Sequence, residues 1–334
     1  MSGAPEQLNV ANLEAPRRRS LWVDSARRLF TEKPLGALGA VVTVALLITG
    51  LFADLLAPYG YNEVFPELAK SPPSARFWLG TDHIGRDMLS RVIYGARISM
   101  IVGLAASVVS SIVELVLGMS SGYLGRKFDL ILQRFVDAVM GFPGIVLLVV
   151  VMSLVGPGMA TIIIVLGLRW GINGSRIIRG AVLSIKSNVY VDAAIATGCR
   201  TTQILVRHIL PHIVAPLIIN FSTRVPGIIL TEASLSFLGY GVPPPAPSWG
   251  GMLSGPGREH MLTAPWIAIW PGVALSVVVY GVNMLGDAVR DILDPRLRGG
   301  SGRYGVRAHL APRRTTATAG EGRARAVAAP TAGD

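Results

Sequence analysis

Few residues of this chain could do chemistry, and the densest polar run among them is GTDHIGRD at 80–87. Two glycines, a histidine and two aspartates suggest either a phosphate-binding loop or a metal site. The glycine spacing fits no phosphate loop, and the histidine has no second histidine near it in the sequence. We therefore interpret this run as an external turn and helix start that contacts another protein.

The motifs of the common catalytic sites are missing from the sequence. It contains no G-x-x-x-x-G-K-[ST] phosphate loop, no H-E-x-x-H zinc motif and no G-x-S-x-G nucleophile elbow. No pair of acidic residues has the context of a general acid and base. We therefore predict that the chain is not an enzyme and that it has no catalytic residue, metal or cofactor.

Three ionisable residues lie within apolar segments: Glu114, Arg224 and Glu232. A charge at the bilayer centre costs about 2.5–3.5 kcal/mol on insertion scales, so such residues usually face a cavity or a partner. Arg224 and Glu232 are eight residues apart, which is about 80° around an ideal helix. We predict all three as candidate pathway-lining residues. The alternatives are a structural hydrogen bond between helices for Glu114 and snorkelling for Arg224.

The segment VDAAIATGCRTTQILVRHILP at 191–211 lies between two long apolar stretches. Its pattern consists of Asp192, Ala193, Ala194, Gly198, Leu210 and Pro211. A carboxylate near a helix start favours the positive end of the helix dipole, and paired alanines let another helix approach closely. Gly198 allows a bend, and Pro211 breaks the helix. The pattern suggests a docking segment for another protein, and an amphipathic interfacial helix is the alternative from the residues alone.

Composition places these segments in a membrane. Hydrophobic residues make up 51% of the 334 residues and charged residues only 15%, whereas a soluble domain carries about 25% charged residues. Apolar stretches that can cross a roughly 30 Å core as helix predict six spans in an all-α membrane protein. These are 35–53, 98–125, two spans within 138–168 on either side of Gly156-Pro157-Gly158, 211–230 and 266–285.

Positive charge sets the predicted orientation. The formal net charge is +11, and lysines and arginines gather in 1–34, at 126–127, in 169–207 and after 299. Because cytoplasmic segments of membrane proteins are rich in these residues, we predict that both termini and 176–211 are cytoplasmic. Segments 57–97 and 236–262 are then external, and the protein is a multi-pass protein of the cell membrane.

Five blocks, in order, carry a resemblance to a known family. They are FWLGTDHIGRDMLSRVIYGARISM (77–100), GYLGRKFDLILQRFVDAVMGFPG (122–144), the 191–211 segment, TEASLSFLGYGVPPPAPSWGGML (231–253) and LGDAVRDILDPRLRG (285–299). Together they resemble permeases of the dipeptide, oligopeptide and nickel ABC importer family, and the first block resembles the shorter-headed of its two partner permeases. The 191–211 pattern resembles the family's coupling loop, although Asp192 stands where the broader signature has glutamate. Arg224 matches no family pattern.

The resemblance implies a type I ABC importer fold with six spans and a cytoplasmic coupling helix. The chain would form half of a translocation pathway for peptides. Its implied partners are a second permease, two ATP-binding subunits that hydrolyse ATP, an extracytoplasmic substrate-binding protein and membrane lipid, without nucleic acid. The six residues of the 191–211 pattern would couple to the ATPase.

The implied division of the chain has four parts. They are a basic cytoplasmic head at 1–34, the first span and external segment at 35–97, a permease transmembrane domain at 98–298 and a disordered cytoplasmic tail at 299–334.

Other functions stay open at this point. The same architecture would suit import of a nickel chelate or a glutathione-like compound, because the binding protein normally sets the cargo. An ATP-independent channel or secondary transporter would need no docking segment and should show midplane charges in inverted repeats, which the sequence lacks. A membrane enzyme should show a catalytic constellation at bilayer depth, which it also lacks.

Overall fold

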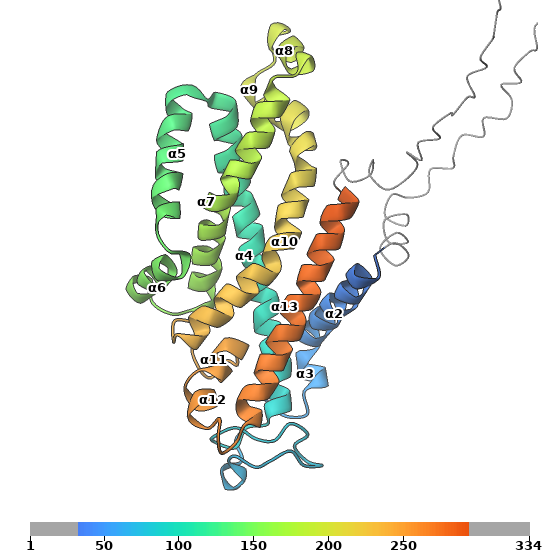
Figure 1. Cartoon of the computed structure of the whole chain (residues 1–334), viewed down its shortest axis with the longest axis vertical. Helices are drawn as coiled ribbons and strands as arrows, with labels where there is room; N and C mark the ends of the chain where they lie inside the picture. Colours follow the sequence, from blue (N-terminus) through green and yellow to red (C-terminus); the bar gives the residue numbers. More distant parts are fainter. Residues whose placement is uncertain (1–32, 294–334) are drawn as a thin grey trace, which may run out of the picture. The chain divides into compact units, whose positions relative to one another are not determined.

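The computed structural model describes residues 33–293, which are almost entirely helical (Figure 1). The elements in chain order are α2 (Pro34–Leu51), α3 (Ala53–Leu56), η2 (Pro66–Leu68), α4 (Met88–Leu124), α5 (Arg126–Gly141), α6 (Gly144–Val155), α7 (Met159–Lys186), α8 (Val189–Ala196), α9 (Thr201–Gln203), η3 (Ile204–Ile209), α10 (Leu210–Phe237), α11 (Trp249–Leu253), α12 (Gly255–Glu259) and α13 (Trp266–Leu293). The all-α prediction is confirmed. Nearly all of the predicted head and the whole predicted tail lie outside the described residues.

Five helical stretches of the described part are long and apolar enough to cross a membrane: α2, α4, α7, the run 201–237 that ends with α10, and α13. Helices α5 and α6 meet at a bend of 93°, and as one broken span they would make a sixth. The predicted break at 156–158 is confirmed, because α6 ends at Val155 and α7 begins at Met159.

Several predicted span boundaries need correction. Helices α10 and α13 continue past the predicted ends at 230 and 285 to Phe237 and Leu293. Helix α4 begins at Met88, ten residues before the predicted start at 98, and α7 continues past 168 to Lys186. Charged residues hid both extensions from a hydropathy argument. In α4, for example, the Arg97 guanidinium donates to the Gly50 carbonyl oxygen at 2.9 Å and pairs with Asp54 at 2.7 Å. The hydrogen bond that Arg97 donates to Asp54, with a second one from Tyr94, holds the pKa of the Asp54 carboxyl below its ordinary value.

Helix α4 packs along α7 at very short range, and glycine makes that approach possible. A Cβ atom at Gly118 of α4 would lie 2.6 Å from the Ile178 Cβ of α7. A Cβ at Gly171 of α7 would lie 2.7 Å from the Ser110 carbonyl oxygen of α4. These two helices therefore form the most extensively packed pair of the bundle.

Helix α5 is held against α7 by charge. The Arg179 Nε and Nη2 atoms each lie 2.6 Å from an oxygen of Asp129. At the far end of α5, Phe142 and Pro143 separate it from α6, and Pro143 has no backbone N–H with which to continue the helix. The bend therefore turns the chain sharply before the 12 residues of α6.

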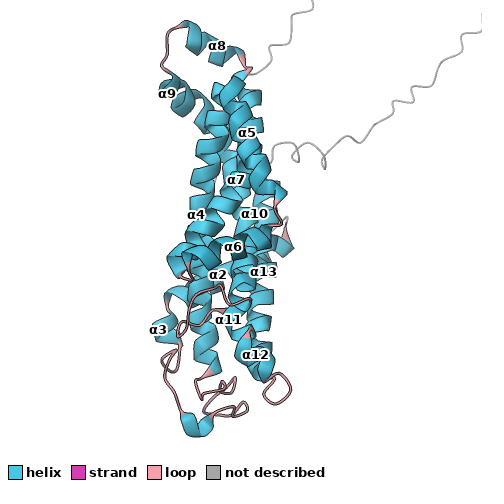
Figure 2. Cartoon of the chain, turned by 90° about the vertical axis from the view of Figure 1, so that its left-hand side faces the viewer, coloured by secondary structure: helices cyan, strands magenta, loops and turns pink. Residues whose placement is uncertain are grey.

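The two ends of the helical bundle carry different elements (Figures 1 and 2). Helices α8 and α9 lie at one end, and α3, α11, α12 and the loops around 57–87 lie at the opposite end. Near the limits of the described chain, Lys33 pairs with Asp291 at 2.7 Å and joins the start of α2 to the last turn of α13.

Candidate functional site

The segment 189–211 forms a compact turn that joins α7 to α10. Helix α8 places Asp192 in its first turn, as expected for a carboxylate at the positive end of a helix dipole. After α8 the chain turns through Gly198, forms the single turn α9 and enters α10 through the π-helical stretch η3. Leu210 and Pro211 are the first two residues of α10, and the helical run continues through them from Thr201 to Phe237. The prediction that Pro211 breaks the helix is therefore wrong, because a proline at the second position of α10 is compatible with the helix.

Gly198 has a backbone φ of +79°, a left-handed conformation that residues with a side chain rarely adopt. A Cβ atom at this position would meet nothing within 4 Å. The backbone angle, rather than a lack of space, therefore explains the glycine. The bend predicted at Gly198 is present.

One face of the segment is anchored and the other is exposed. Its buried apolar residues pack with Ile178 and Val182 of α7; they are Val191, Ala194, Ile204 and Ile209. The exposed face carries Asp192 and Ala193. It also carries large apolar side chains, which are Val189, Tyr190, Ile195 and Val206. The outer face of α8 is therefore partly apolar, and it is exposed in the part of the chain that the structure describes.

The two charged residues Glu114 and Arg224 form an ion pair within the bundle. The Glu114 side chain on α4 is fully buried, and Arg224 on α10 is 8% exposed. Arg224 also donates to the Ser110 hydroxyl at 2.9 Å, and Asn220 donates to Glu114 at 3.5 Å. The pair therefore joins α4 to α10 through the Glu114 Oε2 atom, while the Oε1 atom is buried without a hydrogen-bond partner in the described part of the chain.

Glu232, eight residues further along α10, is also buried but lies in a different environment. It is 1% exposed, and its Oε1 atom accepts a hydrogen bond from the Ser236 hydroxyl at 2.7 Å. Its Oε2 atom has no partner in the described part of the chain. The structure thus pairs Arg224 with Glu114 instead of placing Arg224 beside Glu232. Whether any of the three lines a pathway remains a prediction.

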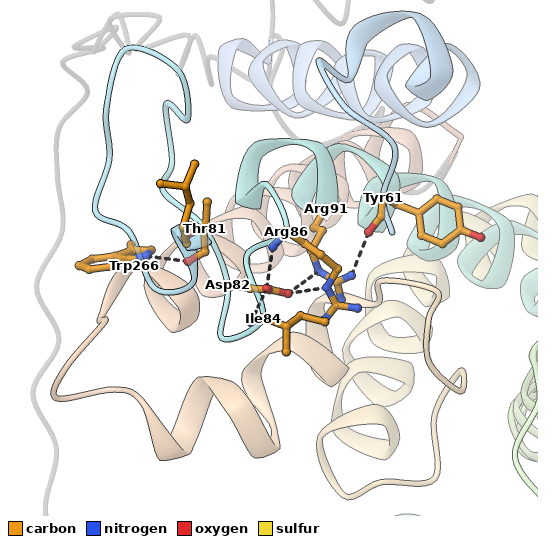
Figure 3. Close-up of polar contacts among 8 residues, drawn as sticks. Tyr61, Thr81, Asp82, Ile84, Arg86, Arg91 and Trp266 are labelled. Atoms are coloured by element: carbon orange, nitrogen blue, oxygen red, sulfur yellow. Dashed lines mark hydrogen bonds and ion pairs between the residues drawn. The ribbon is translucent and has the colours of Figure 1, made fainter. Parts of the chain in front are cut away.

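The 80–87 run forms the turn and helix start that the sequence predicts (Figure 3). Asp82 is buried and accepts hydrogen bonds from the backbone of Ile84 and Arg86 at 3.0 and 2.9 Å, and from the Arg86 side chain at 2.6 Å. Arg91 lies 3.7 Å from the same carboxylate and donates to the Tyr61 carbonyl oxygen. These contacts show that Asp82 and Arg86 stabilise the loop, whereas the Nδ1 atom of His83 is buried without a partner in the described residues.

Residues of the 80–87 run and of the segment 236–256 together line a cavity of about 530 Å³. His83 lies at this cavity and its ring stacks on that of His260, with centroids 6.3 Å apart. Burial lowers the pKa of His83 below its ordinary value. Within residues 33–293 no group of three metal-binding side chains accompanies the two histidines.

Comparison with protein families decides the class of the chain. Residues 114–299 match the family model described as the binding-protein-dependent transport system inner membrane component. Residues 20–73 match the N-terminal transmembrane domain of oligopeptide transport permease C. The chain belongs to this permease family. It is therefore a multi-pass inner-membrane protein and the permease component of an ABC importer.

Curated relatives of the permease cover nearly its whole length. The oligopeptide transport system permease protein OppC of Bacillus subtilis is 35% identical over 88% of this chain and 96% of its own. The dipeptide permease DppC of Alkalihalophilus pseudofirmus is 35% identical over 84% and 91%, respectively. The glutathione permease GsiD of Pectobacterium atrosepticum is 37% identical over 84% and 93%.

A solved structure supports the fold of the permease. A chain of the inward-facing MetNI methionine ABC transporter matches with a TM-score of 0.51 and 18% sequence identity, and the match covers 62% of this chain and 98% of that chain. At this identity the likeness concerns the arrangement of helices alone. It agrees with the predicted importer fold.

The permease has one charged residue that the sequence analysis missed. Arg169 was placed just beyond the fourth span, because that span was ended at Leu168. In the structure α7 runs from Met159 to Lys186, so Arg169 lies well inside the helix. In residues 169–186 polar residues alternate with apolar ones, and a helical pattern of this kind could have predicted that the helix continues past Leu168.

Proposed function

We propose that this permease forms half of the membrane pathway of an ATP-driven peptide importer, and that the segment 189–211 receives the movement of a separate ATPase. The observation that carries the proposal is the exposed apolar face of this segment. The opposite face of the same segment is buried against α7, so the exposed residues are held in place at one end of the bundle.

The coupling role follows from how the segment is attached. A force on α8 would pass to α7 and α10 through the buried contacts of Val191 and Ile204, since well-packed interiors transmit strain. The exposed Val189, Tyr190 and Ile195 would be covered by a docked protein, which is the usual role of an apolar patch on a structured surface. Asp192 and Ala193 lie on the same exposed face and would contact the ATPase.

The proposed assembly has a second, related permease, two ATP-binding subunits and an extracytoplasmic binding protein. The coupling segment would lie in the cytoplasm together with both termini, and 57–87 and 238–265 would face the binding protein. The Lys/Arg distribution and the placement of these elements at opposite ends support this orientation. ATP binding and hydrolysis would switch the two permeases between inward and outward access.

Peptides are the proposed cargo, on the strength of the oligopeptide and dipeptide relatives. Glutathione, the cargo named for another relative, is itself a small peptide derivative and belongs to the same chemical class.

Uptake in a deletion strain tests the function. The strain should lose uptake of labelled tripeptides, and the gene for this chain should restore it. Dipeptides, glutathione and a nickel chelate form the comparison panel, and an ATPase should copurify with a tagged copy of the chain. Normal peptide uptake in the deletion strain, or loss of nickel uptake alone, would contradict the proposed cargo. Absence of any copurifying ATPase would contradict the coupling.

Cysteine labelling tests the orientation separately. With Cys199→Ser as background, we choose the exposed positions Glu67→Cys, Ser187→Cys and Leu262→Cys, the last being 98% exposed. A membrane-impermeant thiol reagent added to intact cells should label 67 and 262 and leave 187 unlabelled. Labelling of 187 alone would mean that the protein has the opposite orientation.

A further inference from the structure

Arg169 lies at membrane depth without a carboxylate partner. It is ten residues from the start of α7 at Met159, which corresponds to about 15 Å along a helix axis. Among residues 33–293 no acidic side chain pairs with it, and its Nε atom is buried without a hydrogen-bond partner. Because a guanidinium group that faces hydrocarbon is costly, its surroundings should supply an anion or water.

The surroundings of Arg169 form a recess of about 280 Å³ between α6, α7 and α10. The residues that line it are Gly144, Ile145, Leu148, Arg169, Trp170, Asn173, Leu230, Thr231 and Ser234. None of them is acidic. Asn173 has a buried side-chain oxygen without a partner in the described chain. The recess therefore combines one uncompensated positive charge with amide and hydroxyl groups.

The start of α6 adds to this positive character. Gly144 is the first residue of α6 and lies beside the arginine, since a Cβ atom there would be 3.1 Å from the Arg169 Nη2 atom. The first N–H groups of a helix lack partners within the helix, and they carry the positive end of its dipole. Two independent sources of positive potential thus meet in the same recess.

We propose that Arg169 and this recess bind a carboxylate group of the cargo as it crosses the membrane, an inference that rests on the proposed peptide import. The terminal carboxylate of a peptide offers two oxygens to the planar guanidinium group. The Asn173 side-chain oxygen has no partner in the described chain and can accept from the N–H of the adjoining peptide group. The Thr231 and Ser234 hydroxyls donate to the Gly227 and Leu230 carbonyl oxygens, so they too can only accept from the cargo. Trp170 provides an apolar surface.

The size and position of the recess favour a transient occupant. Its depth within the span separates it from lipid headgroups. The recess, of about 280 Å³, is larger than one carboxylate group of a neighbouring subunit. Permanent subunit contacts are packed as densely as protein interiors. The half-exposed Ile145 and Leu230 at the recess leave it open to an incoming molecule.

The test compares two cargoes that differ only in charge. The whole importer with its binding protein is reconstituted in vesicles, and transport of trialanine is measured against that of its C-terminal amide. Both are supplied at concentrations that saturate the same batch of binding protein, so a change in the acid-to-amide rate ratio comes from the permease. The variants are Arg169→Gln, Arg169→Lys and Gly144→Ala. The matched control is Arg176→Gln, which removes an arginine of the same helix that is paired with Asp137 outside the recess.

We expect Arg169→Gln to lower the acid-to-amide ratio by about tenfold, the factor expected for one charge-assisted hydrogen bond. Arg169→Lys should restore part of the ratio, because it keeps the charge without the planar fork. Gly144→Ala should lower it by a smaller factor by displacing the guanidinium group, and Arg176→Gln should leave it unchanged.

Three outcomes would overturn the proposal. An unchanged ratio in Arg169→Gln and Gly144→Ala would mean that the cargo carboxylate does not use the recess. Equal losses for both cargoes, with less assembled complex, would assign Arg169 to an ion pair with a neighbouring subunit. If the wild-type importer carries neither peptide, the proposed function itself fails, and the inference fails with it.

Discussion

Two of the arginines in the membrane-spanning helices differ in whether an acidic side chain pairs with them. Arg224 on α10 is paired with the buried Glu114 and bonded to Ser110, whereas Arg169 on α7 has no acidic partner in residues 33–293. Arg224 is almost fully buried, whereas Arg169 lines a recess. The comparison indicates that charge at membrane depth has two uses here. A paired charge holds helices together, and an unpaired charge in a recess is available to a ligand.

The largest effect is expected when the buried pair is broken. Arg224→Leu leaves Glu114 buried without its main partner, and removal of one member of such a pair typically costs about 3–5 kcal/mol. Thermal unfolding of the purified chain in detergent should show a much lower midpoint, with less inserted protein in cells.

The double variant Glu114→Met with Arg224→Met serves as its control. It replaces both charges by apolar groups and should recover most of the lost stability. An Arg224→Leu variant as stable as the wild type would contradict the structural role assigned to the pair.

A smaller effect is expected from the partly exposed pair between Arg179 and Asp129. Arg179→Gln removes two charge-assisted hydrogen bonds that hold α5 against α7, and a loss of about 1–2 kcal/mol is expected. Proteolysis near the turn at Gly125 should become faster, while α4 and α7 remain packed. If cleavage is unchanged, α5 is held by its apolar contacts alone.

Removal of the unpaired arginine should not destabilise the chain. Arg169→Leu eliminates a charge without a partner, so the free energy of unfolding should stay within about 0.5 kcal/mol of the wild type or rise. Unfolding of this variant is measured beside Arg224→Leu. A loss as large as that of Arg224→Leu would abolish the distinction between the two arginines.

A similarly small effect is expected at the exposed pair of Lys33 and Asp291. Both side chains are more than one third exposed, and such pairs contribute about 0–1 kcal/mol. Lys33→Gln should leave unfolding and transport almost unchanged at moderate salt. A large loss of stability would mean that the junction of α2 and α13 depends on this contact. It would also contradict the assumption that the more buried charges of the four variants contribute more to stability.

The sequence predicts the helical class and the positions of most spans, because long apolar stretches and the Gly156-Pro157-Gly158 break are local signals. The start of α4 and the end of α7 were missed because Arg97 and Arg169 interrupt the apolar pattern, and the surroundings of these arginines depend on distant residues. The partner of Arg224 could not be predicted from periodicity along one helix, since Glu114 belongs to another. The bend at Gly198 was predicted because glycine adopts its backbone angle.

The central claim, that the 189–211 segment transmits the movement of the ATPase, is tested most directly by ATP hydrolysis of the complex in lipid. The measurement compares stimulation by loaded binding protein in wild type, Gly198→Val and Gly125→Val. Both glycines have positive φ, +79° and +63°, and a Cβ at either meets nothing within 4 Å, so both variants strain the backbone without a steric clash. We expect all complexes to reach the membrane, Gly198→Val to lose the stimulation or shed the ATPase, and Gly125→Val to keep the stimulation. Full stimulation with normal ATPase content in Gly198→Val would contradict the claim.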